Sequence, residues 1–349
     1  MSSTSAYELA LEKFRASLAV AQSREVTKRI IEDREIVYSR YQPVFELEKL
    51  PNLSEETFRS FLYFENNRHW GGLYRHASKL TVDMNLLRST LSILVDDSRP
   101  LAKRYYEAVS GLRGLGKAVA TAILHVNSPN EFGIWNNTSA AALKALNIWP
   151  QFKSGSHFGN KYEEINKLLL RLATDLEIDL WTLDALMWIV APKNGAEPFS
   201  EEEIVFASQD QKFGLERHLH DFLFDNWDHT SLGKEWQLHT EAGDDDAGYE
   251  YPTDIGRIDL LAHHRTKPEW LIVELKRGQS SDETVGQVSR YMGWVRKNLA
   301  KKNEIVRGLI ISQTADPSIY YSIEGLGVDT ISVQTYELEF HLKPVRFNS

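Results

Sequence analysis

The sequence Gly-Arg-Ile-Asp-Leu-Leu-Ala-His-His-Arg-Thr-Lys-Pro-Glu-Trp-Leu-Ile-Val-Glu-Leu-Lys, residues 256–276, holds two apolar runs that carry charged residues. Asp259 lies within the first run, and Glu274 and Lys276 end the second. Charged side chains are costly inside buried strands, so these three need a physical reason. Side chains alternate along a strand, so Glu274 and Lys276 project from one face. If residues 263–269 turn the two runs into a hairpin, Asp259 can join them there.

Two carboxylates and one ammonium at a shared point predict a divalent-metal site with a lysine beside it. Hard divalent cations take oxygen ligands and lower the pKa of a bound water molecule. This is the chemistry of metal-dependent phosphodiester hydrolysis. The alternative interpretation is a buried salt bridge, Asp259–Lys276 or Glu274–Lys276, that only holds two strands together.

The hydrophobic pattern changes along the chain. It is helical up to about residue 50 and again from 54 to 190, with the last two helices expected over 162–173 and 180–190. Turn residues without periodicity at 191–198 predict a domain boundary. Beyond it we expect helices over 213–224 and 283–299, and strands over 236–239, 256–262, 270–275, 308–312 and 330–333.

This order of elements predicts an α+β multidomain chain. A helical segment covers residues 1–53, and an all-α domain covers residues 54–195. An α/β domain with a mixed central sheet flanked by helices covers residues 203–349.

Further polar residues accompany the two charged runs. Glu216 lies on the helix predicted over 213–224, and Gln287 and Tyr291 stand four residues apart on the helix predicted over 283–299. The whole set resembles the PD-(D/E)XK nuclease superfamily. Residues 256–261, 273–277 and 286–291 are similar to the C-terminal domain of NucS-type endonucleases, and the resemblance covers residues 203–343.

This resemblance implies a role for each residue. Asp259 and Glu274 would bind Mg²⁺ or Mn²⁺ together with the Leu275 carbonyl, and Glu216 would add a carboxylate. Lys276 would orient or deprotonate the attacking water, or stabilise the transition state. We favour orientation or stabilisation, because neighbouring anions oppose the loss of its proton. Gln287 would position the site and Tyr291 would support it; the alternative for these two is an ordinary place at the helix edge.

The segment 112–120 looks like the hairpin of a helix-hairpin-helix motif. Gly114 and Gly116 would let a tight turn present backbone N–H groups to a phosphate, and Arg113 and Lys117 would add positive charge. The alternative is an ordinary turn between helices. Helix-hairpin-helix glycosylases carry a catalytic Asp a little downstream, but residues 134–139 contain no acid, so base excision is not predicted.

The segment 66–70 mixes amide, cationic and aromatic side chains. Arg68 and Trp70 could hold a DNA strand through a phosphate contact and base stacking. The alternative places Trp70 in the core.

The net charge of −9 does not describe the local charge along the chain. Residues 61–154 contain 11 Lys and Arg against 6 Asp and Glu, a local charge of +5 that ordinary surface variation could also produce. Phosphate binding follows local rather than net charge. Asp244, Asp245 and Asp246 belong to the acidic segment 241–254, which we interpret as a solvated loop.

The bulk composition limits the classes of protein. The chain has 349 residues and no cysteine, which excludes disulfides and thiolate chemistry and fits a cytoplasmic protein. No apolar stretch approaches the roughly 20 residues that a membrane span needs, so no membrane partner is expected.

We therefore expect a Mg²⁺-dependent endonuclease acting on DNA, in DNA repair or in defence against foreign DNA. A nuclease for RNA or branched structures and a non-cutting DNA-binding or assembly protein are the alternatives. Cutting both strands with one active site per chain would call for a homodimer.

Overall fold

The computed structural model describes residues 5–153, 155–192, 214–241, 244–280, 282–325 and 330–337. The chain forms two compact units. The first consists of Met1–Phe213 and Leu238–Ile258, and the second of Gly214–Gln237 and Asp259–Ser349. From residue 193 onward, the boundary segment predicted at 191–198 lies outside the described residues.

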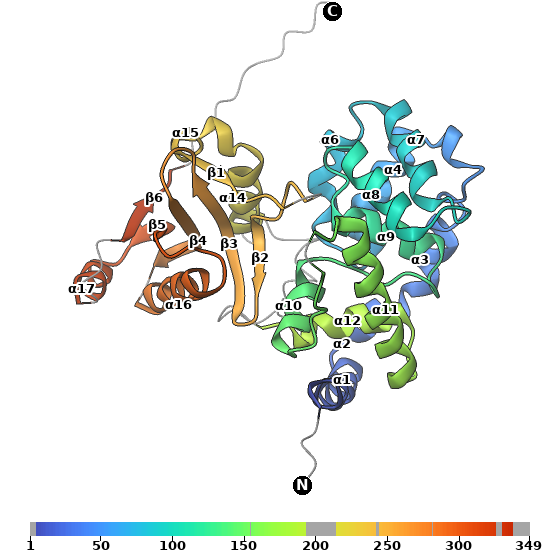
Figure 1. Ribbon diagram of the computed structural model, residues 1–349, viewed down its shortest axis with the longest axis horizontal. Coiled ribbons are helices and arrows are strands. Elements are labelled where there is room, and N and C mark those ends of the chain that lie inside the picture. The colour runs from blue at the N-terminus through green and yellow to red at the C-terminus, as the bar shows by residue number, and fades with distance from the viewer. Residues whose placement is uncertain are drawn as a thin grey trace, which may run out of the picture. The chain divides into compact units, whose positions relative to one another are not determined.

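The first unit is built from helices, as the periodicity predicts (Figure 1). The expected helices over 162–173 and 180–190 are confirmed as the last two of the following set. In order these are α1 (Ala6–Ser23), α2 (Glu25–Glu32), α3 (Arg34–Tyr41), α4 (Glu55–Leu62), α5 (Phe64–Asn67), α6 (Ala77–Leu80), α7 (Met84–Val95), α8 (Leu101–Gly111), α9 (Lys117–Asn127), α10 (Asn137–Ala145), α11 (Phe158–Leu176) and α12 (Leu180–Val190), with short 3₁₀ turns η1 (Leu50–Asn52) and η2 (Leu73–His76). In the described part of the chain, no helix is long and apolar enough to cross a membrane.

Local sequence starts several of these helices. Ser5, Ser54, Asp83 and Asp179 stand at N-caps, and each side chain accepts a hydrogen bond from a backbone N–H of the first turn. Such caps satisfy donors that the helix itself leaves unpaired. The helix α12 is buried along most of its length, and its Trp181 is completely buried, so this helix lies in the core.

A histidine sits in the same core without its charge. His125 of α9 is 0% exposed, and its Nδ1 lies 2.7 Å from the Phe132 carbonyl oxygen and its Nε2 lies 2.8 Å from the Tyr38 hydroxyl. A carbonyl only accepts, so Nδ1 carries the proton and Tyr38 donates to Nε2. Burial lowers the pKa of His125 to about 4, so its ring is neutral at physiological pH.

The second unit and the strands around it contain the mixed sheet that the sequence predicts. The helical elements are α14 (Gly214–Asp225), η3 (Trp227–His229), α15 (Ser231–Glu235), α16 (Asp282–Asn298) and α17 (Ser318–Gly325), and the strands are β1 (Trp236–Leu238), β2 (Tyr249–Thr253), β3 (Gly256–His264), β4 (Glu269–Ser280), β5 (Ile305–Ala315) and β6 (Ile331–Thr335). The strand order is β1-β3-β4-β5-β6, with β2 also paired to β3. The β3–β4 pair is antiparallel, whereas β4–β5 and β5–β6 are parallel (Figure 1).

Besides the short η3 and α15, two elements of this part of the chain were not expected from the sequence. The strand β2 contains Pro252 and has Glu250 at a φ of 45°, features that are rare within strands. The helix α17 is only eight residues long, which is too short for a clear periodic signal.

The neutral His125 predicts acid sensitivity of the helical unit. The unfolded histidine has a pKa near 6.5, so below this pH the unfolded chain takes up a proton that the folded one refuses until about pH 4. Stability is therefore lost as the pH falls from 6.5 towards 4, by roughly 2 kcal/mol at pH 5. We expect urea unfolding, followed by far-UV circular dichroism, to show that His125→Gln is less stable than wild type at pH 7. The difference in stability between the two proteins should be smaller at pH 5. A difference that does not change with pH would contradict the assignment of His125 as a neutral buried histidine.

Candidate active site

The antiparallel β3–β4 ladder brings the first carboxylate to the second charged run. Leu260 pairs with Val273, and the next position of this register sets Asp259 opposite Glu274. The Asp259 side chain is fixed there, because its Oδ2 accepts a hydrogen bond of 2.8 Å from the backbone N–H of Leu275. The predicted hairpin is thus present, and Asp259 turns towards β4 rather than away from it.

The strand β4 supplies a carboxylate and a lysine. Glu274 is 2% exposed, and its Oε1 lies 2.9 Å from the Lys276 ammonium nitrogen. The same nitrogen donates to Gln287 Oε1 at 3.3 Å. The β4–β5 register shifts between Lys276 and Gln279, so the ladder is irregular directly after the lysine.

The helix α16 packs closely against β5 and contributes the remaining residues of this arrangement. A Cβ built on Gly308 of β5 would lie 2.4 Å from Val288 Cγ1, so only glycine permits so close an approach of helix and strand. Gln287 and Tyr291 are 7% and 2% exposed. Burial, followed by the charge of Glu274, raises the pKa of Tyr291, and Asp259 adds to the rise. Both carboxylates therefore act on the Tyr291 hydroxyl, which stays protonated and able to donate a hydrogen bond.

A histidine that the sequence did not single out also reaches this point. His220 of α14 is 8% exposed, and its Nε2 lies 2.9 Å from the Asp259 backbone oxygen, to which it donates. Glu216 stands four residues earlier in the same helix, but its side chain lies outside the described part of the structure. The i, i+4 spacing of Glu216 and His220 was a signal in the sequence that could have identified the histidine.

In the first unit, the segment 112–120, predicted to contact phosphate, turns at its glycines and enters α9. Gly114 has a φ of 93°, a conformation that other residues rarely adopt, and Gly116 is the N-cap of α9. Lys117, the first residue of α9, pairs with Asp244 at 2.6 Å, and this pair is enclosed, with side-chain exposures of 12% and 4%. Arg113 is 86% exposed, and its Nε lies 3.9 Å from Asp245 Oδ2. The interpretation of the acidic segment as a solvated loop is therefore wrong for Asp244, because a lysine far away in the sequence binds it.

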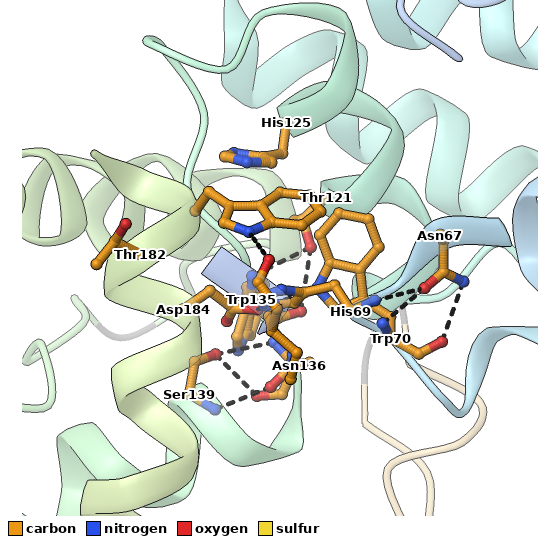
Figure 2. Close-up of polar contacts among 12 residues, drawn as sticks. Asn67, His69, Trp70, Thr121, His125, Trp135, Asn136, Ser139, Thr182 and Asp184 are labelled. Atoms are coloured by element: carbon orange, nitrogen blue, oxygen red, sulfur yellow. Dashed lines mark hydrogen bonds and ion pairs between the residues drawn. The ribbon is translucent and has the colours of Figure 1, made fainter. Parts of the chain in front are cut away.

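The segment 66–70 is part of the core rather than a strand-gripping surface (Figure 2). Trp70 is 4% exposed, and its indole N–H donates to Asp184 Oδ2 at 3.0 Å, an oxygen that also lies 2.7 Å from His69 Nε2. The buried Asn67 side chain accepts from the backbone N–H groups of His69 and Trp70 and thereby fixes the turn. Trp70 is thus not available for base stacking, whereas Arg68 is half-exposed, with a left-handed φ of 59°.

Comparison with known proteins bears on the C-terminal part alone. Residues 235–338 match the family described as the Endonuclease NucS C-terminal domain. No curated protein and no solved structure matches the chain significantly. The matched range contains Asp259, Glu274, Lys276, Gln287 and Tyr291, and it begins after Glu216 and His220. Over residues 235–338 the chain therefore has a domain of the NucS C-terminal type.

Proposed function

We propose that the C-terminal domain hydrolyses phosphodiester bonds of DNA with the help of Mg²⁺ or Mn²⁺ held at Asp259 and Glu274. The observation that carries this proposal is the convergence of Asp259 from β3 with Glu274 and Lys276 from β4, within a NucS-type domain. DNA is the proposed substrate because of this family match, and the helical unit is proposed to dock on the same DNA.

The donor chemistry of these residues fits such a metal ion. Asp259 and Glu274 carry two negative charges, and Lys276 balances one of them. Within the described residues, no group of three or more His, Asp or Glu side chains is arranged to hold a metal. Mg²⁺ keeps several waters and commonly uses one or two carboxylates, so two side chains are sufficient. We propose that the Leu275 carbonyl and Glu216 add oxygen ligands.

The bound metal would lower the pKa of a coordinated water and neutralise charge on the phosphate. The chain's own residues then have separate tasks. Lys276 donates to Glu274 and Gln287, so its positive charge is held beside the carboxylates, where the phosphate and the attacking water are proposed to bind. We assign to it stabilisation of the negative charge that grows in the transition state.

Gln287 and Tyr291 are proposed to be positioning residues. Gln287 fixes the direction of the lysine from α16. The Tyr291 hydroxyl stays protonated in the field of the two carboxylates, so it can donate a hydrogen bond to one of them and hold its orientation. His220 fixes the β3 backbone at Asp259 in the same way.

Removing the lysine tests the reaction. We expect Lys276→Ala to lower the rate of Mg²⁺-dependent cleavage of supercoiled DNA by at least about 100-fold, because charge stabilisation in the transition state is lost. The matched control is Lys267→Ala in the turn before β4, about 30 Å along the strand from Lys276. If both variants cut at the wild-type rate, Lys276 has no part in the chemistry. If the wild type binds DNA but is inert with either metal, a non-cutting DNA-binding protein becomes the better interpretation.

A second variant tests metal binding without removing a hydrogen bond that stabilises the fold. In Asp259→Asn the amide oxygen can still accept the Leu275 N–H, so the hydrogen bond of 2.8 Å is retained while the charge is removed. We expect isothermal titration with Mn²⁺ to show at least about tenfold weaker binding, because a neutral amide is a poor replacement for a carboxylate ligand. The unfolding midpoint should stay close to that of wild type. Unchanged Mn²⁺ affinity would remove Asp259 from the metal site.

The range of substrates separates the biological roles. We propose a cleavage panel of plain, mismatched, branched and modified duplexes together with RNA. Preference for mismatched or damaged duplex supports a role in DNA repair, and preference by modification state supports defence against foreign DNA.

A further inference from the structure

An acidic loop lies on the hairpin that the sequence assigns to phosphate binding. The segment 241–254 contains six Asp and Glu and no Lys or Arg. Three of these acids, Asp244, Asp245 and Asp246, are consecutive; the first two contact cationic side chains of the first unit, and the third contacts a histidine. We call these three residues the acidic loop.

The partners of the acidic loop are two cations of the hairpin and a histidine near it. Asp244 pairs with Lys117 at 2.6 Å, and Asp245 lies 3.9 Å from Arg113. Asp246 Oδ2 lies 3.2 Å from Nδ1 of His76, at the end of η2. Two cations of the hairpin therefore meet carboxylates, where the sequence predicts a phosphate.

The position of Asp244 is that of an anion bound at a helix start. Its partner Lys117 is the first residue of α9, and a Cβ built on the N-cap Gly116 would lie 3.9 Å from Asp244 Oδ1. Gly116 has no side chain that could cap this helix, and the first N–H groups of a helix have no partner within it. Carboxylate and phosphate oxygens bind such a place through the same charge-assisted interactions.

The acidic loop is shaped by its own backbone. Glu241 and Asp244 exchange two backbone hydrogen bonds, of 3.0 and 2.9 Å, and Asp244 Oδ1 accepts from the Asp246 N–H. The chain is then held at Tyr249, where the Asn137 amide donates to the backbone oxygen at 2.6 Å and the Arg75 guanidinium lies 3.5 Å from the ring centre. The loop is thus anchored on its C-terminal side, while Asp245 at its tip remains 65% exposed.

We propose that the acidic loop is an autoinhibitory phosphate mimic. It occupies the anion site of the hairpin, and a DNA backbone must displace it before Lys117 and Arg113 can contact phosphates. This inference rests on the proposed docking of the helical unit on DNA. It adds that the intact chain binds DNA more weakly than the hairpin alone would allow.

The test measures DNA affinity without any cleavage. Binding of a fluorescent DNA duplex is followed by anisotropy in EDTA, for wild type and for the triple variant Asp244→Asn, Asp245→Asn, Asp246→Asn. We expect the triple variant to bind roughly five- to tenfold more tightly, because the competing carboxylates are neutral. The control Glu12→Gln, Glu163→Gln, Glu164→Gln removes the same charge from two exposed positions and the partly exposed Glu163, on α1 and α11, and its affinity should change less than twofold.

A double-mutant cycle with Lys117 distinguishes displacement of the acidic loop from a general effect of charge on DNA affinity. Lys117→Ala should weaken binding only slightly in wild type, where Asp244 already neutralises it, and several-fold in the triple variant. If the triple variant loses structure, the double variant Asp245→Asn, Asp246→Asn, which leaves the enclosed Asp244–Lys117 pair intact, should still bind more tightly than the matched control Glu163→Gln, Glu164→Gln.

Equal affinities of the triple or double variant and its control would overturn the inference, as would a Lys117→Ala effect of equal size in both backgrounds. Because these readings need no metal, they are independent of the cleavage test with Lys276→Ala. A protein that fails to cut DNA can therefore still pass this test, and an active nuclease can fail it.

Discussion

The charge of Glu274 in the interior of the C-terminal domain constrains the elements around it. A carboxylate that is 2% exposed is stable there only with partners that replace its lost hydration. Lys276 provides one such partner from the same strand, and it is held in turn by Gln287 of α16. The helix can reach the lysine because Gly308 leaves room for Val288 over β5. The packing of α16 on β5 and the position of the Lys276 ammonium group therefore depend on each other.

With the second carboxylate, Asp259, this arrangement would be unfavourable if its role were only structural. Asp259 is held beside Glu274 through the Leu275 N–H, and both raise the pKa of Tyr291. Asp259, Glu274 and Lys276 together carry one net negative charge. Replacing such a group by apolar residues would often stabilise a fold, so its presence favours a function that uses the excess charge.

The β3–β4 hairpin could be predicted because its signals are local. Short apolar runs define both strands, and the three charges lie within 18 residues of each other. Gln287 and Tyr291 follow from helical spacing. The strand β2 could not be predicted, since Pro252 and the positive φ of Glu250 break the pattern that identifies strands.

The acidic loop and Trp70 were misjudged for a different reason, because their partners are distant in the sequence. Lys117 and Asp244 are 127 residues apart, and Trp70 and Asp184 are 114 residues apart. The sequence shows where a group of acids or an indole stands, but it does not show which distant residues these side chains contact. A run of aspartates is usually solvated, but Asp244 in this run is enclosed, because the lysine that it meets belongs to a helix start elsewhere in the chain.

The two proposals give the two regions opposite charges towards a DNA backbone. At the hairpin, Asp244 already neutralises Lys117, so a phosphate in its place would gain only the difference between its own interaction and that of Asp244. At the C-terminal site, carboxylates outnumber the lysine, so these residues alone would repel a phosphate, and the proposed divalent cation would reverse this effect. Under the two proposals, competition within the chain would limit binding at the first region, and the metal would limit reaction at the second. Such a chain would hold DNA without cutting it when the metal is absent, and a DNA backbone would have to displace the acidic loop to reach the hairpin.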